Sequence, residues 1–383
     1  MTLIKQAILK GGLASAALLT VMSTQAATLN AGDTKVKIGG YIKLDALWSS
    51  FDNNVDTGSA REFYVPGATP VSSGPSNNYF DMHAKQTRIH LGTESTVGGK
   101  KLKSYFEIDF MTQVGGNERS TNGYAPELRH AFFEYDKWLF GQTWSTFMNV
   151  GALPESVDFI GNTDGTIFVR QAQIRYTRGP LQFSIENPET TTPGPTANDD
   201  NEWPDFVARY NLKNNDLSLV FAGLLRQLTV NDGTVDDTEM GWGISVTGKY
   251  VFGNKNDIRF GLNTGGGLGR YLAINTSAGA AVDNNNQLEA IDSLGLFASY
   301  RHHWNQKLRS NFIYSALDVD NNINLAGIGN GTTKGTWSGR ANLMFDWAKN
   351  LTLGGELTLA NREVESGADG DLTRLQFMAM YKF

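Results

Sequence analysis

Alternation of apolar and polar residues is the main pattern of this chain, and it is clearest in the stretch from Leu375 to the last residue, Phe383. A period of two places apolar side chains on one face of a β-strand and the remaining side chains on the other face. A terminal strand has an unprotected edge unless another strand pairs with it, and closure of a barrel provides that partner. The pattern therefore predicts an all-β chain whose last strand closes a barrel.

The same period recurs in about sixteen segments between turn signals, most of them long enough to cross an outer membrane at a tilt. The predicted strands are 34–49, 82–96, 100–111, 126–136, 137–142, 166–178, 180–187, 204–213, 216–227, 239–252, 256–268, 291–303, 306–316, 335–347, 350–362 and 371–383. The predicted long connections are 50–81, 112–125, 143–165, 188–203, 228–238, 269–290, 317–334 and 363–370.

Short polar turns alternate with these long connections along the whole chain. One rim of short turns and one rim of long loops is the arrangement of an up-and-down antiparallel barrel in an outer membrane. A soluble β-sandwich would explain the strands but not the alternation of connector lengths. An alternating last strand that ends on phenylalanine is also typical of bacterial outer-membrane barrels. The sequence therefore predicts a transmembrane barrel in the bacterial outer membrane.

Two of the predicted strands carry the apolar face that such a barrel turns toward lipid. Aromatic residues lie at both ends of these faces and aliphatic residues lie between them, as in the two aromatic girdles of a membrane barrel. The residues concerned are Trp242, Ile244, Val246 and Tyr250 on one strand and Trp337, Ala341, Leu343, Phe345 and Trp347 on the other.

Residues 1–26 have the features of a secretory signal peptide: Lys5 and Lys10 precede an apolar stretch, and Ala26 is a small residue suited to cleavage. The apolar stretch is shorter than the ~20 residues of a spanning helix. We therefore expect residues 27–383 to form the mature barrel domain.

Composition narrows the possible partners. The formal charge is −6, and loss of the two signal-peptide lysines makes it −8, which argues against nucleic-acid binding. The chain has 0 cysteines, so disulfides and thiolate metal sites are excluded. We expect no cofactor and no metal, and contacts with outer-membrane lipid and lipopolysaccharide.

The face opposite the apolar one lines the lumen, and its predicted content is more basic than acidic. A guanidinium keeps its charge and fits a carboxylate or phosphate, so a row of them would favour anions in a narrow pore. The alternative is that these cations pair with inward acids and have only a structural role in the wall. The candidate pore-lining cations are Lys43, Arg88, Arg175, Arg209, Arg259, Arg301 and Arg340.

The connection 143–165 is too apolar for a solvated loop, since it contains Trp144, Phe147 and Phe159. A long connection of this composition normally packs against another part of the protein. We expect it to fold into the barrel as a constriction loop, with Glu155 and Asp158 facing the basic wall across the opening. A loop that caps the barrel from outside or packs at a subunit contact is the alternative.

Several motifs resemble those of one family, the DcaP-type porins of Gram-negative bacteria. The resemblance covers the mature chain and rests on Gly39–Asp45, Gln86–Ile89, Phe106–Phe110, Leu128–Ala131, Gly141–Phe147 and Arg170–Tyr176. It implies a homotrimer of sixteen-stranded barrels that passes small anionic solutes, with dicarboxylates as the associated class. Lys43, Arg88 and Arg175 lie within the matching motifs. Longer members carry a helical segment before the barrel, which we do not expect here because the first predicted strand begins so soon after residue 26.

Other classes of function find little support in the residues. The five histidines assemble into no catalytic triad, so we expect no enzyme. The acidic stretch at 318–322 lacks the glycine and glutamate of a calcium loop. The sequence therefore predicts a passive, anion-preferring diffusion channel. A weakly selective porin of the same fold and an adhesin or structural barrel remain the alternatives.

Overall fold

The structure is a computed structural model that describes residues 27–53, 59–71, 74–112, 121–193 and 201–383. The predicted signal peptide, residues 1–26, lies outside the described residues. Within these described ranges, no helix is both long enough and apolar enough to cross a membrane.

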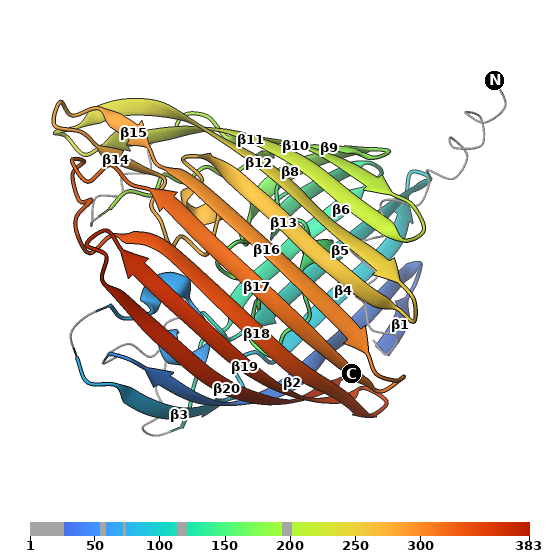
Figure 1. Cartoon of the computed structure of the whole chain (residues 1–383). Coiled ribbons are helices and arrows are strands. Elements are labelled where there is room, and N and C mark those ends of the chain that lie inside the picture. The colour runs from blue at the N-terminus through green and yellow to red at the C-terminus, as the bar shows by residue number, and fades with distance from the viewer. Residues whose placement is uncertain (1–26, 54–58, 72–73, 113–120, 194–200) are drawn as a thin grey trace.

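The described strands form one closed antiparallel barrel of 16 strands (Figure 1). Closure is made by the first and last wall strands, which pair from Tyr41 opposite Lys382 to Phe51 opposite Leu372. The wall consists of β2 (Thr34–Phe51), β3 (Asn77–His83) with β4 (Arg88–Val97), β5 (Lys100–Asp109), β6 (Glu127–Tyr135), β7 (Trp138–Trp144), β8 (Arg170–Arg178), β9 (Leu181–Glu186), β10 (Asp205–Lys213), β11 (Leu217–Asn231), β12 (Asp236–Phe252), β13 (Asn256–Gly266), β16 (Asp292–His303), β17 (Leu308–Asp320), β18 (Thr333–Ala348), β19 (Leu351–Val364) and β20 (Asp369–Lys382). The prediction of a closed sixteen-stranded barrel is confirmed.

Four details differ from the prediction. The wall strand predicted at 82–96 is interrupted, and its parts β3 and β4 both pair with β2. The predicted long loop at 228–238 is a tight hairpin, because β11 and β12 stay paired as far as Asn231 opposite Asp236. The short strand β1 (Ala27–Ala31) pairs with the start of β2 and was not predicted. Two further short strands, β14 (Ala280–Val282) and β15 (Leu288–Ala290), form a separate ribbon.

Side chains alternate between the two faces of the wall as the sequence pattern requires. Trp337, Leu343 and Trp347 are exposed on β18, whereas the intervening Arg340 and Met344 are buried. An apolar face in contact with solvent in the free chain is the face that lipid covers in a membrane. The predicted lipid-facing residues of β12 and β18 thus lie on the outer surface.

Short helical turns occur only in the connections of the described chain. They are α2 (Ser59–Glu62), η2 (Pro66–Ala68), η3 (Val150–Ala152) and η4 (Gly269–Tyr271). The largest buried apolar cluster joins these connections to the wall: Phe147, Leu268 and Tyr271 pack with inward side chains such as Leu224. Parts of the long connections therefore supply the core that a hollow barrel lacks.

A loop inside the barrel and a basic wall segment

The connection between β7 and β8 lies inside the barrel. Its backbone and side chains bond to wall residues that alternate with the outward apolar ones. The Thr146 amide donates to Glu186 on β9 at 2.8 Å, and the Asn149 side chain donates to Thr247 on β12 at 2.9 Å. The Gly165 amide donates to Ser315 on β17 at 2.7 Å. These contacts reach strands on several sides of the wall, so the connection crosses the lumen, as the notable apolar content of 143–165 predicts.

A glycine allows the end of this loop to approach the wall. A Cβ atom on Gly165 would lie 2.0 Å from the carbonyl oxygen of Leu296 on β16. Real Cβ atoms do not approach backbone so closely, so only glycine permits this contact. The Asn263 side chain completes the attachment by donating to the Gly165 carbonyl at 2.7 Å.

Glu155 and Asp158 contact the wall directly. Glu155 accepts two hydrogen bonds of 2.6 Å from Arg309, and Arg301 lies 3.8 Å away. Burial disfavours the charge of Glu155, but its hydrogen bonds to Arg309 and the charge of Arg309 outweigh burial, so its pKa is lowered. Asp158 forms an ion pair of 2.9 Å with Arg340. The expectation that both acids face the wall across an opening is therefore corrected: each lies against an arginine and anchors the loop.

The connection between β2 and β3 contributes a second inward contact. Tyr64, in the segment after α2, donates its hydroxyl to Asp164 at 2.7 Å, and its amide donates to Asp158. Asp164 is fully buried, and burial raises its pKa despite hydrogen bonds from Ser338 and Tyr64. The two long connections therefore hold each other in place inside the barrel.

Three of the predicted pore cations are matched by carboxylates that balance their charge. Lys43 lies 2.9 Å from Asp45 on the same strand. Arg88 lies 3.1 Å from Asp109, a carboxylate that it shares with Arg129. Arg340, beside Asp158, also lies 3.3 Å from Glu356. Close pairs of opposite charge cancel at a distance, so this part of the wall offers little net field to a passing solute.

The remaining predicted cations lie on β8 to β16 and have fewer acids. Arg175 is buried, and its guanidinium donates to Thr146 at 2.7 Å and to the Trp144 carbonyl at 2.6 Å. Arg209 is half-buried and donates to the Met148 carbonyl at 2.6 Å. Neither forms an ion pair with any acid in the described part of the chain. Both arginines therefore hold the loop through neutral oxygens and keep their charge uncompensated at contact distance.

Three cations share the single carboxylate of Asp257 on β13. Arg259 lies 2.7 Å from it, Arg301 is in contact with it, and Lys249 lies 3.9 Å from it. Asp257 is buried, whereas the side chain of Lys249 is 29% exposed and that of Arg301 is 21% exposed. Both side chains are thus partly exposed on the inner face of the wall.

Lys249 was not among the predicted site residues. The signal was present, because it alternates with the outward Trp242, Ile244 and Tyr250 on β12. The structure brings Lys249, Arg259 and Arg301 together through direct cross-strand pairing, with Lys249 opposite Arg259 and Arg301 opposite Asp257. We call Arg209, Lys249, Arg259 and Arg301 the basic wall segment.

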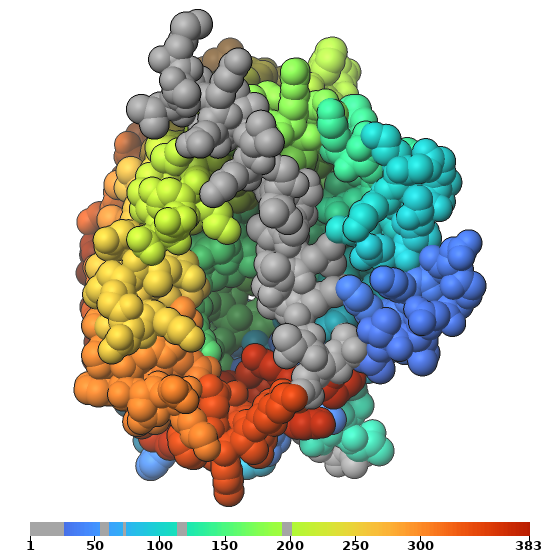
Figure 2. All heavy atoms as spheres, turned by 90° about the vertical axis from the view of Figure 1, so that its right-hand side faces the viewer, coloured from blue at the N-terminus to red at the C-terminus, as the bar shows by residue number. Residues whose placement is uncertain are grey.

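The rim of short turns is hollowed at its centre (Figure 2).

Within the described ranges, no group of three or more histidine, aspartate or glutamate side chains is arranged to hold a metal ion. The architecture is that of an outer-membrane β-barrel with an internal loop and a charged lumen wall.

A sequence profile described as DcaP outer membrane protein matches residues 7–383. The chain therefore belongs to the DcaP outer membrane protein family and is a protein of the bacterial outer membrane, which confirms the resemblance found in the motifs. No match was found among curated proteins.

Solved structures share the fold at low sequence identity. The chain is similar to the outer membrane channel DcaP of Acinetobacter baumannii, with 24% identity, a TM-score of 0.79 and coverage of 94% of this chain and 100% of that one. It is also similar to Salmonella typhi OmpF in complex with daunomycin, with 13% identity, a TM-score of 0.57 and coverage of 93% and 100%. A trimer form of Vibrio cholerae OmpT matches with 11% identity, a TM-score of 0.52 and coverage of 92% and 100%.

Proposed function

We propose that this protein is a passive diffusion channel that favours small anionic solutes, with no catalytic step. The observation that carries the proposal is the arrangement around Asp257, where Lys249, Arg259 and Arg301 surround one carboxylate. Arg301 also lies near Glu155, which Arg309 binds together with Asp346, so four cations face three acids in this cluster. Membership of the DcaP family and the likeness to a named channel of that family support the channel part of the proposal.

The basic wall segment sets the preference through charge. An anion that passes it gains attraction, and a cation is repelled, while the partly solvated lumen keeps each contact weak enough for release. A guanidinium also matches the planar fork of a carboxylate. Small carboxylates are therefore the solute class we propose, and dicarboxylates rest on the family resemblance.

The other predicted site residues have a different part in this proposal. Lys43, Arg88 and Arg340 are matched by acids, and Arg175 is buried beneath the loop. Glu155 and Asp158 attach the loop to the wall and so fix the width of the opening. We infer that these residues set the shape of the constriction and that the basic wall segment sets its charge.

A weakly selective porin is the second candidate. The matched ion pairs of Arg88 and Arg129 with Glu107 and Asp109 favour it, because they make one side of the wall nearly neutral.

For either kind of channel, we propose that residues 1–26 are removed on export, that the mature barrels assemble as a homotrimer, and that their outer faces contact lipid and lipopolysaccharide.

The test is the reversal potential of purified protein in a planar bilayer under a potassium chloride gradient, repeated with a dicarboxylate salt. We expect chloride preference and partial block of the chloride current by the dicarboxylate. Cation preference would refute the charge assignment while leaving the channel intact. Absence of conductance from correctly folded barrels would refute the channel itself.

A further inference from the structure

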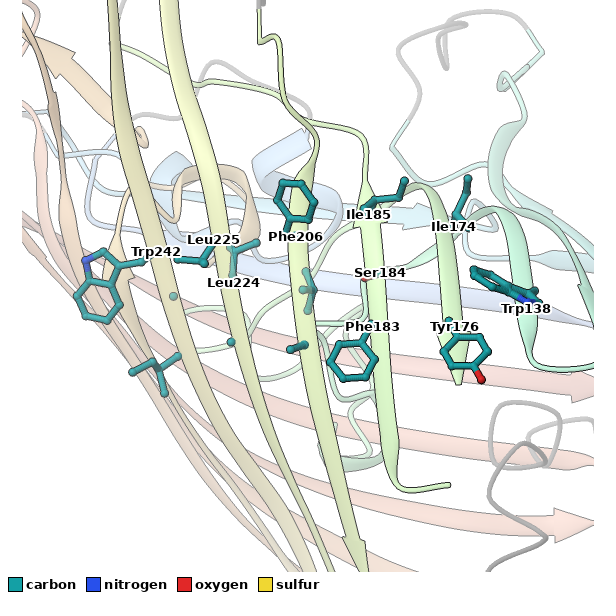
Figure 3. Close-up of a pocket in the computed structure, with 15 residues that line it drawn as sticks. Trp138, Ile174, Tyr176, Phe183, Ser184, Ile185, Phe206, Leu224, Leu225 and Trp242 are labelled. Atoms are coloured by element: carbon teal, nitrogen blue, oxygen red, sulfur yellow. The ribbon is translucent and has the colours of Figure 1, made fainter. Parts of the chain in front are cut away.

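The outer face of the barrel is hollowed over β7 to β12 by a groove of about 740 Å³ (Figure 3). Its lining is almost entirely apolar and comes from six neighbouring strands. Because the protein resides in the outer membrane, this groove opens into the lipid bilayer. We propose that it binds an anionic glycerophospholipid of the periplasmic leaflet, with one acyl chain in the groove.

Register explains why the groove exists. Along the middle of the face, Tyr176, Phe183, Ala208, Gly223 and Ile244 are successive cross-strand neighbours. Large side chains occupy the ends of this row, but Ala208 and Gly223 lie directly opposite each other at its centre. The two smallest side chains of the row therefore form the floor of the groove.

Rows of large side chains flank the floor. On one side, Phe206, Leu225 and Trp242 are cross-strand neighbours and line the groove. On the other side, beyond the lining residues, Tyr210 pairs with Phe221. These two rows are four residues apart along each strand, which is about 13 Å between their Cα atoms. Because the flanking side chains occupy part of this distance, the width that remains between the rows suits a single hydrocarbon chain. A second barrel, whose outer surface is convex, would need a protruding row of residues to fill it.

Charge identifies the head group. Arg178 is the last residue of β8 and shares the outward face with Ile174 and Tyr176, which line the groove. Lys137 is exposed in the adjoining short turn, and its carbonyl accepts a hydrogen bond of 2.9 Å from Thr177. Neither cation forms an ion pair with the acids of the described chain.

The spacing between cation and groove matches one lipid molecule. Two strand spacings and two residues along a strand separate Arg178 from Ala208, which places their Cα atoms about 12 Å apart. Short turns face the periplasm in outer-membrane barrels, where the leaflet consists of glycerophospholipids. A phosphate held by Arg178 and Lys137 would thus leave an acyl chain within reach of the groove.

The test is native mass spectrometry of the purified barrel with added dioleoyl-phosphatidylglycerol or dioleoyl-phosphatidylethanolamine. Wild type is expected to retain the anionic lipid preferentially. Arg178→Gln should weaken its retention by about fivefold, the effect of one cation near an anionic head group, and should weaken retention of the zwitterionic lipid less, because that lipid has no net charge. Lys349→Gln, which removes an exposed cation from another short turn, is the matched control and should have no effect.

Filling the groove tests the acyl-chain contact separately. A Cβ atom on Gly223 would have only one neighbouring atom within 4 Å, the Gly243 carbonyl oxygen at 4.0 Å, so the backbone leaves room for Gly223→Leu, which should fill the floor. Retention of both lipids should fall on the order of tenfold, as expected when about two buried methylene contacts are lost. Gly339→Leu is the control, since nothing lies within 4 Å of that position on β18 and it lies outside the groove.

Three results would overturn the proposal. Equal losses in Gly223→Leu and Gly339→Leu would make the groove ordinary lipid-exposed surface. A change of oligomeric state in Gly223→Leu would make it a subunit contact. Retention of lipopolysaccharide in place of phosphatidylglycerol would reject the periplasmic lipid as occupant. Ala208→Leu repeats the test if Gly223→Leu fails to give the heat-resistant folded band on a gel.

Discussion

Lys249→Gln is the sharpest test of how this barrel would select charge. Lys249 projects into the lumen with 29% of its side chain exposed, and its ion-pair partner Asp257 is 3.9 Å away and already held by Arg259 and Arg301. Loss of such an exposed, loose pair costs at most about 1 kcal/mol of stability. The variant should therefore fold normally while the excess of one positive charge in the cluster around Asp257 is removed.

The magnitude follows from Coulomb attraction between one lumen charge and a passing ion. At about 8 Å, a unit charge contributes roughly 0.5 kcal/mol if the pore is as polar as bulk water and roughly 2 kcal/mol at an effective dielectric constant of 20. This corresponds to about a twofold to thirtyfold weaker partition of an anion into the pore, and the partition of a cation rises by the same factor. Screening at high salt reduces the difference, so the effect should shrink toward 1 M salt.

The assay is the reversal potential in a planar bilayer under a tenfold potassium chloride gradient. Lys349→Gln, which removes an equivalent charge from an exposed turn, is the matched control and should behave as wild type. Reversal potentials that are the same in Lys249→Gln, Lys349→Gln and wild type would refute the assignment of selectivity to the basic wall segment. A larger conductance without a change in selectivity would point to a steric role instead.

Three further predictions concern the internal loop. Arg340→Ala should lower the free energy of unfolding by about 3–5 kcal/mol, because it leaves two buried carboxylates uncompensated, and urea titration in detergent measures this loss. Gly165→Ala should cost about 1–3 kcal/mol by forcing the loop away from β16, and it should alter single-channel conductance, whereas Gly339→Ala on the open outer face should do neither. Glu155→Gln should increase anion preference at neutral pH by removing a negative charge beside Arg301 and Arg309, although Arg309 keeps its pair with Asp346. Because Arg309 lowers the pKa of Glu155, this contact is present above the ordinary carboxyl pKa and is lost only as pH falls through the lowered value, so wild type should approach the variant only in acid. A wild-type channel that changes between pH 7 and pH 5 while Glu155→Gln does not would contradict this reasoning.

The barrel could be predicted from sequence because its determinants are local. The alternation of apolar and polar residues shows which side chains share a face of a strand, and turn residues mark where each strand ends. The pattern could not foresee the break between β3 and β4 or the long β11–β12 hairpin. Both depend on pairing with neighbouring strands, and β2 pairs with β3 over one half and with β4 over the other.

The candidate site was only partly predictable, for the same physical reason. Alternation correctly placed Arg88 and Arg259 on the inner face, but it carries no information about which acid lies across the strand. Arg88 meets Asp109 on the next strand, whereas Arg259 shares one carboxylate with two other cations. Lateral register decides this difference, and a single sequence does not specify register between strands far apart in the chain.

The attachment of the loop and the proposed anion preference depend on some of the same side chains. Arg209 donates to the Met148 carbonyl and Arg259 to the Leu153 carbonyl, so each holds the loop while adding positive charge to the lumen. A neutral replacement of either residue would alter both the width of the opening and its charge, and the two effects could not be separated in a conductance measurement. Lys249 makes no hydrogen bond to the loop among the described contacts, and its one ion pair is shared. Charge at that position can therefore be removed while the loop stays attached, which is why a change of selectivity in Lys249→Gln would locate the anion path and a change in Arg259→Gln would not.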